Sequence, residues 1–333
     1  MIRRPPRSTL SSSSAASDVY KRQINEAIAE EMRRDSNVFI MGEDIRLSVY
    51  GATANLYKEF GEERVLDTPL SENGFFGAAI GASLVGMRPI VETVTSFMWV
   101  AMDQLISQAA KMRYMFGGQA TLPVVYRASM MYGSGSAAHH SDRPYPMFMN
   151  MPGIKIAVPA NSTDAKGLLK TAVRDDDPVI IFEDANLYGT RSEMLEDEIP
   201  FGKAEIVKSG TDCTIVGIAA SVNLSLDVAN NLEKEGISCE VVNPRTLVPL
   251  DKETILKSVE KTGRLVIVDP AHKVCSAASE ISSIVAEEGF WDLQSPIIKV
   301  ASEQVHIPYA PVSYTHLRAH ETGRNLVCRL LLE

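Results

Sequence analysis

The sequence lacks an excess of basic residues. Its 333 residues include 33 Lys and Arg against 42 Asp and Glu, so the formal net charge is −9. A surface that binds a polyanion needs clustered Lys and Arg to neutralise phosphate groups. The composition therefore argues against a nucleic-acid partner.

Long apolar runs and cysteines are also scarce. No uninterrupted apolar stretch approaches the roughly 18 residues of a membrane-spanning helix, so we expect no membrane association. The four cysteines have no metal-ligand spacing and are few for a disulfide framework, and we assign them no chemistry. Reduced thiols fit a reducing compartment best, and we expect a bacterial cytoplasmic protein.

The common phosphate-binding and hydrolase motifs are missing. The sequence has no Gly-x-Gly-x-x-Gly after a predicted strand, no Gly-x-x-x-x-Gly-Lys-Ser/Thr and no Gly-x-Ser-x-Gly, which argues against Rossmann, P-loop and α/β-hydrolase functions. A Gly-Asp-Gly followed at a distance by Asn, which would hold a diphosphate through magnesium, is missing as well. The chain thus carries no recognisable phosphate cradle.

The two ends of the chain differ from its middle. Residues 1–23 are rich in Arg and Ser and hold a single acid, the composition of an organelle transit peptide, which keeps a mitochondrial matrix location as the alternative. Adjacent prolines and a four-serine run oppose the amphipathic helix of such a peptide. Residues 313–333 are basic and show no clear element boundary. We interpret both segments as foreign tails that resemble translated cloning sequence, and assign no role to His316, His320 and Cys328.

Between the tails, β-branched runs alternate with helical stretches. We first predict five strands, each bounded by Gly, Pro, Asn or Asp, within residues 37–44, 88–94, 122–129, 153–159 and 178–184. Helices fall between them at residues 23–35, 100–118 and 161–177. The last of these begins with Ser162 and Thr163 in the cap position. This alternation implies a mostly parallel sheet covered on both faces.

A segment rich in charge, Gly and Pro interrupts this rhythm near residue 200, and we place a domain boundary there. The alternation then resumes, with strands predicted within 213–220, 237–247, 264–271 and 296–302 and helices within 221–236, 251–263 and 276–289. The predicted fold class is α/β, with two parallel-sheet, three-layer domains at residues 24–197 and 203–312.

A single carboxylate, Glu72, opens the run TPLSENGFFGAAIGASLVG at residues 68–86, which holds four glycines and no other ionisable group. This composition predicts a buried segment. In the structural explanation, the helix macrodipole favours a carboxylate in the first turn by roughly 0.3 to 1 kcal/mol. In the functional one, the glycines let a flat ligand or a partner helix approach, and low dielectric raises the pKa of Glu72 toward neutrality.

Two further stretches are candidates for a site. SGSAAHHSDRPYP places His139 and His140 in a loop after a predicted strand, where α/β sheets usually carry their chemistry. A surface loop with only local hydrogen bonds is the alternative, and no third ligand is spaced for a metal. VTSFMWVAMDQ holds Phe97 and Trp99, whose bulk is typical of core packing or an interface as well as of a ring-stacking wall.

Several segments together resemble a known family. INEAIAEEMRRDSNVFIMGEDI, RVLDTPLSENGFFGAAIGASLVGMRPI and EGISCEVVNPRTLVPLD are similar to the β subunit of the thiamine diphosphate-dependent decarboxylase component of 2-oxoacid dehydrogenase complexes. The family includes the pyruvate, branched-chain 2-oxoacid and acetoin enzymes. The resemblance implies a transketolase-like fold, in which a pyrimidine-binding domain precedes a transketolase C-terminal-like domain. The family continues past residue 311, where this chain departs from it, so we expect the last helix to be absent.

The resemblance also implies the site residues. Glu72 lies in the family's SE-x-G motif, whose Glu hydrogen-bonds the pyrimidine N1′ of thiamine diphosphate and acts as a general acid and base on that cofactor. Phe97 matches the family aromatic near the aminopyrimidine. The segment between Glu92 and Phe97 is one residue shorter than usual, and we choose Val94 as the remaining residue that lines the pyrimidine.

Three more expectations follow from the family. His140 matches the loop histidine that assists acyl transfer to a lipoyl group, although the usual AQHSQ here reads AHHSD, which leaves substrate and lipoyl preference open. Some relatives bind potassium through carbonyls of the RDDDP turn, which implies a potassium site at Asp175 and Asp177. In the two-subunit enzymes the α subunit holds the magnesium and the diphosphate, which accounts for the missing phosphate cradle.

The resemblance implies a β subunit in an α2β2 heterotetramer that decarboxylates a 2-oxoacid, or cleaves acetoin, and passes the acyl group to the lipoyl domain of the dihydrolipoyl acyltransferase. Two alternatives stay open. A transketolase-like or deoxyxylulose-phosphate synthase-like transferase would carry its own diphosphate-binding half upstream, where this chain has only residues 1–23. A noncatalytic interaction module of the same fold would not need Glu72, Phe97 and His140.

Overall fold

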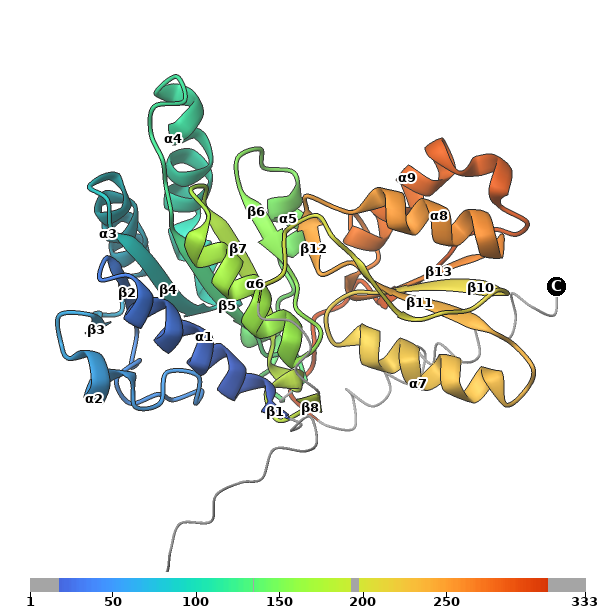
Figure 1. Cartoon of the computed structure of the whole chain (residues 1–333), viewed down its shortest axis with the longest axis horizontal. Helices are drawn as coiled ribbons and strands as arrows, with labels where there is room; N and C mark the ends of the chain where they lie inside the picture. Colours follow the sequence, from blue (N-terminus) through green and yellow to red (C-terminus); the bar gives the residue numbers. More distant parts are fainter. Residues whose placement is uncertain (1–17, 134, 193–197, 311–333) are drawn as a thin grey trace, which may run out of the picture.

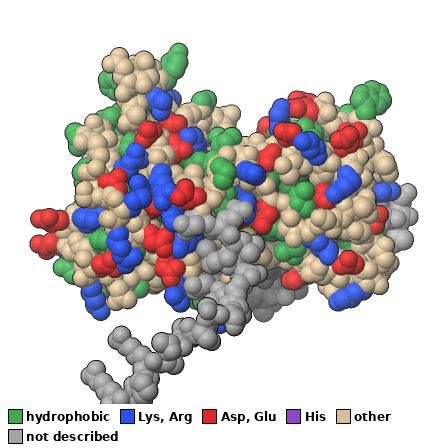
Figure 2. Space-filling view, viewed as in Figure 1, with side chains coloured by type: hydrophobic (Ala, Val, Ile, Leu, Met, Phe, Trp, Pro, Cys, Tyr) green, Lys and Arg blue, Asp and Glu red, His purple; other side chains and the backbone are tan. Residues whose placement is uncertain are grey.

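The computed structural model describes residues 18–133, 135–192 and 198–310. The C-terminal segment 313–333, with His316, His320 and Cys328, lies outside the described residues. Two α/β units lie next to each other, each a sheet with helices on both faces (Figure 1). On the face shown in Figure 2, acidic and basic side chains are interspersed. In the described ranges, no helix is long and apolar enough to cross a membrane.

The larger sheet has seven strands in the order β12-β6-β7-β5-β4-β2-β3, where β12 (Thr246–Val248) comes from the second half of the chain. Six of them are parallel and come from the first half of the chain. They are β2 (Val38–Gly42), β3 (Val65–Asp67), β4 (Arg88–Val94), β5 (Val125–Met130), β6 (Lys155–Ala157) and β7 (Val179–Asp184). Their central strands are buried on both faces, as the β-branched runs predict. β3 was not predicted, because three residues are too few to show a period.

Helices cover both faces of this sheet. One face carries α1 (Tyr20–Arg34), α2 (Leu56–Phe60) and α6 (Ser162–Arg174); the other carries α3 (Glu72–Leu84), η1 (Thr95–Ala101), η2 (Asp103–Ala109) and α4 (Ala110–Met115). The predicted helix at 100–118 is therefore a succession of 3₁₀, π and α turns. It stops before Gly117 and Gly118, whose φ angles are positive.

The cap of α6 lies one residue earlier than predicted. Asn161 has an extended backbone, and its side chain accepts a hydrogen bond from the backbone N–H of Asp164. Ser162 and Thr163 are already helical. Asn161 is therefore the residue that satisfies the helix end.

The fold also begins earlier than predicted. The short strand β1 (Asp18–Val19) pairs with β8 (Arg191–Ser192), and α1 starts at Tyr20, inside the predicted tail 1–23. Tyr20 is fully buried, and its ring stacks on that of Tyr188 with centroids 6.0 Å apart. Because this burial requires contacts distant in sequence, composition alone does not reveal it. Residues 18–23 belong to the first domain, and residues 1–17 lie outside the described part.

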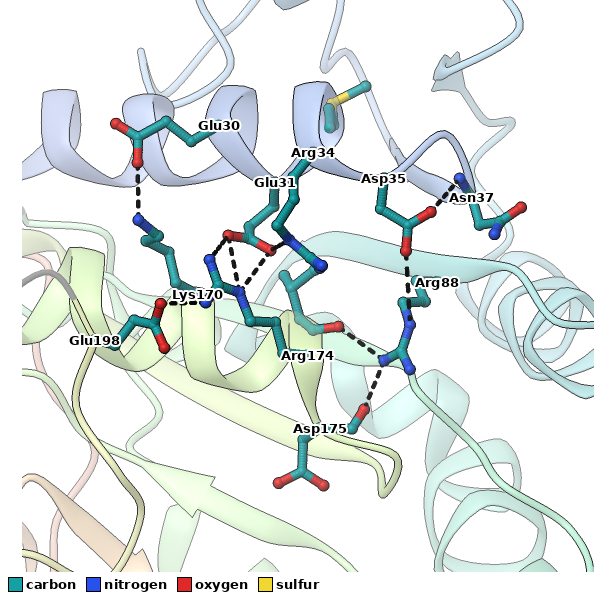
Figure 3. A network of polar contacts seen from close by, with 12 residues as sticks. Glu30, Glu31, Arg34, Asp35, Asn37, Arg88, Lys170, Arg174, Asp175 and Glu198 are labelled. Carbon is teal, nitrogen blue, oxygen red and sulfur yellow. Dashed lines mark hydrogen bonds and ion pairs between the residues drawn. The ribbon is translucent and has the colours of Figure 1, made fainter.

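Ion pairs join α1 to α6 across their contact (Figure 3). The buried carboxylate of Glu31 accepts from Arg34 at 2.6 Å and from Arg174 at 2.6 Å. Glu30 accepts from Lys170 at 3.0 Å. Removal of one partner from a buried carboxylate leaves an uncompensated charge, so this network holds α1 in a defined position on α6.

The smaller sheet has five strands in the order β14-β13-β10-β11-β9, of which only the edge strand β9 is antiparallel. The strands are β9 (Glu205–Lys208), β10 (Cys213–Gly217), β11 (Cys239–Asn243), β13 (Leu265–His272) and β14 (Ile298–Ser302). Helix α7 (Ser221–Glu233) covers one face, and α8 (Lys252–Thr262) and α9 (Ala277–Glu288) cover the other (Figure 1). All of these strands and helices except β9 lie at the positions that the sequence predicts. Short segments complete the described chain: η3 (Ala138–His140), α5 (Tyr145–Met149), η4 (Ala185–Leu187) and η5 (Phe290–Asp292).

The predicted strand at 237–247 is divided between the two sheets. Arg245, with φ of 60°, breaks it, and the next strand β12 (Thr246–Val248) pairs antiparallel with β6 of the first sheet. Arg245 Nε also donates to the buried carboxylate of Asp164 at 2.8 Å, and Asn243 donates to the same carboxylate at 2.7 Å. One hydrophobic cluster continues from the first sheet into the second. The two units therefore share a core.

Candidate active site

The carboxyl ends of parallel strands meet at one edge of the first sheet, where such sheets usually carry their chemistry. β4 ends at Val94 and leads into η1, which holds Phe97. The loop after β5 contains His140 at the end of η3. Glu72 begins α3 after the segment that follows β3. The fold thus brings all four predicted residues to one edge.

A cavity of about 210 Å³ opens at this edge. Val94, Phe97 and Leu70 contribute apolar walls, while Glu43 and Glu92 contribute carboxylates. The volume is smaller than the roughly 300 to 1,000 Å³ of pockets for drug-sized ligands, and it suits a single ring system. The cavity therefore combines a surface for a flat ring with acceptors for its polar edge.

Glu43, directly after β2, is a carboxylate that the sequence analysis missed. Its Oε1 atom is buried and has no hydrogen-bond partner in the described part of the chain. Burial and the neighbouring charges of Glu72 and Asp44 raise the pKa of Glu43 to about 7. Such a carboxyl holds or releases a proton near neutral pH, which is the property of an acid-base residue. An acid directly after a buried strand was the signal available in the sequence.

Glu72 is half-buried, and the run around it is buried on one face only. The prediction of a buried segment is therefore wrong for this chain. Phe75 and Phe76 pack into the core, but the opposite face of α3 is exposed. Small residues on that face leave it flat and uncovered, because no other element of the described chain packs over it. Large apolar side chains also stay exposed beside it, at Leu70, Leu84 and Val85.

Glu92, one of the cavity-lining residues, belongs to a buried ion triad. Arg127 on β5 donates from Nη1 to Glu92 on β4 at 2.5 Å, and from Nε and Nη2 to Glu183 on β7 at 2.7 and 2.9 Å. Burial raises the pKa of Glu92, and the Arg127 guanidinium opposes this change. Burial lowers and the two carboxylates raise the pKa of Arg127, with a net increase. Arg127 thereby stays charged and holds both carboxylates in place.

His140 contacts Phe97, a residue from a distant part of the sequence. Their ring centroids are 5.4 Å apart and their planes are perpendicular. His139 is exposed, and its ring centroid lies 6.2 Å from that of His140. Of the paired histidines, the structure therefore places His140 against Phe97 of the cavity wall, and its role in acyl transfer stays a prediction.

Comparisons with known proteins agree with this architecture. Residues 19–190 match the pyrimidine binding domain of transketolase, and residues 202–320 match the transketolase C-terminal domain. The chain is 47% identical over 306 residues to acetoin:2,6-dichlorophenolindophenol oxidoreductase subunit beta of Cupriavidus necator, covering 87% of this chain and 90% of that one. It is 43% identical over 292 residues to pyruvate dehydrogenase E1 component subunit beta of Rickettsia bellii, covering 86% and 90%. The chain belongs to the family of 2-oxoacid and acetoin dehydrogenase β subunits.

Other members of the family match this β subunit almost equally well. The 2-oxoisovalerate dehydrogenase subunit beta of Bacillus subtilis is 44% identical over 299 residues, covering 88% of this chain and 91% of that one. Among solved structures, a split-gene transketolase, described as an inactive beta4 tetramer, superimposes with a TM-score of 0.77 at 24% identity, covering 94% of this chain and 98% of that one. This likeness confirms the predicted transketolase-like fold.

The predicted potassium ligands of the β subunit lie at the amino end of β7, on the opposite edge of the sheet. The carbonyl oxygen of Asp175 accepts from Arg88 Nη1 at 3.0 Å (Figure 3). Lys155 Nζ lies 2.7 Å from the Asp175 carboxylate and 3.1 Å from that of Asp177. Over the described ranges, no group of three or more His, Cys, Asp or Glu side chains could hold a metal ion. Potassium bound by carbonyls stays a prediction.

Proposed function

We propose that this β subunit, together with an α subunit, forms a thiamine diphosphate-dependent enzyme that decarboxylates a 2-oxoacid, or cleaves acetoin, and transfers the acyl group to a lipoyl group. The observation that carries the proposal is the ring-sized cavity walled by Phe97 and Val94, with Glu43 in its lining and Glu72 near Glu43. The acetoin, 2-oxoisovalerate and pyruvate relatives are 47%, 44% and 43% identical, so the test includes all three substrate classes.

The residues present fit the aminopyrimidine of the cofactor. Phe97 and Val94 offer flat apolar contact, and the unpartnered Oε1 of Glu43 is an acceptor for a polar edge. Glu72 lies close enough to Glu43 for its charge to raise the pKa of that carboxyl. When bound, thiamine diphosphate supplies a thiazolium ring that accepts the electrons released as the substrate carbon–carbon bond breaks.

The side chains of this chain have distinct roles in proton transfer and in holding the ring. With the cofactor bound, Glu72 would hold and exchange a proton at the pyrimidine N1′, as general acid and base. Burial and the charges of Glu72 and Asp44 raise the pKa of Glu43 to about 7, so Glu43 can hold a proton near neutral pH. The Arg127 guanidinium holds Glu92 in the lining of the cavity, and Phe97 would offer its ring to the aminopyrimidine and exclude water. His140 lies beside Phe97, where it can donate a proton to an incoming lipoyl sulfur.

A partner subunit accounts for the uncovered face of α3. A Cβ added at Gly81 would meet nothing within 4 Å, so packing within the described chain does not require glycine there. The side chains of Leu70 and Val85 are 83% and 80% exposed beside this face. Contiguous exposed apolar surface marks an interaction site. We assign it to the α subunit of an α2β2 heterotetramer, which also supplies the magnesium and diphosphate site.

Further partners follow from this role. The acyl acceptor is the lipoyl domain of a dihydrolipoyl acyltransferase. Potassium bound by the carbonyls of Asp175 and Asp177 would stabilise the turn before β7. The relatives are bacterial, which supports a complex of the bacterial cytoplasm rather than the mitochondrial matrix.

The test is dye-linked oxidation of pyruvate, branched-chain 2-oxoacids and acetoin by the chain coexpressed with its α subunit, in the presence of thiamine diphosphate and magnesium. We expect turnover to require the α subunit. Glu72→Gln should lower the rate by about 10² to 10⁴-fold, since it removes the acid-base group. Glu63→Gln, the same change at an exposed position, is the matched control.

Two results would reject the proposal. Turnover by the chain alone would show that no α subunit is needed, and ketol transfer between sugar phosphates would favour the transketolase-like alternative. A folded pair that turns over none of the substrates would favour the noncatalytic interaction module.

A further inference from the structure

The His140 imidazole is not held by polar contacts of its own. Its ring meets Phe97 edge-on and approaches His139, and in the part of the chain that the structure describes it makes no hydrogen bond or ion pair. An aromatic edge contact defines a distance but permits rotation and sliding. The position of His140 therefore depends on the residues that follow it in the loop.

Asp142 attaches this loop to η1. Its carboxylate Oδ2 accepts a hydrogen bond from Trp99 Nε1 at 2.8 Å, and its backbone carbonyl accepts from Thr95 Oγ1 at 3.2 Å. Both donors belong to η1, the same helix that presents Phe97. One short helix thus holds the loop at two points and also supplies the ring against which His140 packs.

Trp99 is itself fixed by packing. Its indole stacks on the ring of Phe148 in α5, with centroids 6.4 Å apart and planes inclined by 11°. Phe148 is fully buried. A buried or half-buried indole N–H needs an acceptor, and a carboxylate gives it a charge-assisted bond. On the far side of the loop, Arg143 Nε donates to the carbonyl of Pro270 at 2.7 Å, which holds the loop against the second unit.

We propose that Asp142 and Trp99 are positioning residues for His140, and that their hydrogen bond holds the imidazole edge-on to Phe97 for acyl transfer to the lipoyl group. In this transfer the S–S bond of the lipoyl disulfide would break as it takes two electrons from the cofactor-bound acyl carbon, which forms a C–S bond with one sulfur. The acyl carbon would then lose its hydroxyl proton to solvent and its bond to the cofactor, which leaves the thioester. The other sulfur takes a proton, which His140 donates. The inference rests on the proposed function and gives a role to Trp99, which the sequence also allowed as mere core packing.

The hydrogen bond can be observed without turnover. The chain has two tryptophans, and Trp291 is 92% exposed, so a Trp291→Phe background leaves Trp99 as the only indole fluorophore. In that background we expect Asp142→Ala to shift the emission maximum. Asp142→Asn keeps an acceptor oxygen and should stay near the parent. An emission maximum that Asp142→Ala does not change would show that the bond does not form and would overturn the inference.

The role is tested by two rates of the complete complex with the α subunit. Dye reduction reports the steps before transfer, and acylation of a free lipoyl domain reports the transfer. We expect Asp142→Ala and Trp99→Phe to lower the acylation rate by about 10 to 10²-fold and to change dye reduction by less than about twofold, because they misplace only His140. Asp142→Asn should retain most of the acylation rate. Trp291→Phe is the control.

The outcomes separate the inference from the proposed function. An equal loss of both rates, or no loss of either, overturns the positioning role while the proposed function stands. If the parent complex reduces no dye with any of the three substrate classes, the proposed function fails and the inference fails with it. Only a selective loss of acylation, restored by Asp142→Asn, supports both.

Discussion

Two sets of carboxylates in and near the cavity differ in their partners. Glu92, which lines the cavity, and Glu183 share the guanidinium of Arg127, and all three side chains are buried. Glu43, also in the lining, and the nearby Glu72 have no ion-pair partner among the described residues, and the charge of Glu72 helps raise the pKa of Glu43. A paired carboxylate stabilises the fold, whereas an unpaired one at a cavity is available to exchange a proton. At this site, the presence or absence of an ion-pair partner, more than burial, distinguishes structural carboxylates from those that can exchange a proton.

The largest effect should come from breaking the paired set. Arg127→Met would leave two buried carboxylates without their cation, and we expect it to lower the free energy of unfolding by about 3 to 5 kcal/mol. Urea unfolding followed by circular dichroism measures this loss. Arg33→Met is the matched control, because Arg33 forms a comparable pair with Glu59 in which both side chains are largely exposed.

The control should change the free energy of unfolding by no more than about 1 kcal/mol, since exposed pairs contribute little. If the two arginine variants lose similar stability, the buried triad is not the structural element that the comparison requires.

A buried carboxylate that is held by hydrogen bonds lies between the two units and should give a smaller loss. Asp269 is buried and accepts from the Tyr145 hydroxyl and from the backbone N–H groups of Ala271 and Ala278. Tyr145→Phe removes the hydrogen bond that the hydroxyl donates to Asp269 and the one that it accepts from the Ala271 backbone N–H, which should cost about 1.5 to 3 kcal/mol in unfolding free energy. Tyr114→Phe, at a tyrosine that is 90% exposed, should stay within about 0.5 kcal/mol. A loss no larger than that of the control would show that the Tyr145 hydroxyl does not stabilise the fold through Asp269.

Glu43, which has no ion-pair partner among the described residues, should make the free energy of unfolding depend on pH. The pKa of Glu43 rises from its ordinary value of 4.5 to about 7 on folding, so the native state binds more protons than the unfolded state between these values. The stability of the parent chain should therefore fall relative to Glu43→Gln as the pH rises from about 4.5 through about 7. Urea unfolding of both proteins across this range measures the difference. A constant difference would mean that Glu43 titrates normally.

The sequence predicts the repeating elements better than the contacts between them. Runs such as VIIFED and LVIVDPA predict buried strands because their β-branched residues are not interrupted by alternating polar residues. β12 is too short to show a pattern, and its partner β6 lies in the other half of the chain. The helix at α1 was predicted from its apolar stripe, but its start at Tyr20 depends on a contact with Tyr188.

The same holds for the site: some of its residues could be predicted from the sequence, and others depend on contacts in the fold. Glu72, Phe97 and His140 follow from the resemblance to the family, which supplies their roles without geometry. Arg127 reads as one charged residue within a strand, and only the strand register places it beside Glu92. The raised pKa of Glu43 could not be predicted from the sequence either, because it depends on burial and on the charge of Glu72, two features of the folded chain. Whether a carboxylate has an ion-pair partner depends on the fold, so it cannot be predicted from single residues in the sequence.

The three residues of β12 limit how this chain can be divided. A fragment ending near residue 200 would leave the edge of the first sheet at β6 without its neighbour, and exposed strand edges promote association between chains. It would also leave the buried carboxylate of Asp164 without Arg245 and Asn243. We therefore expect the first unit to aggregate when expressed alone. Two fragments produced together should reassemble, with the second half supplying the missing strand in trans.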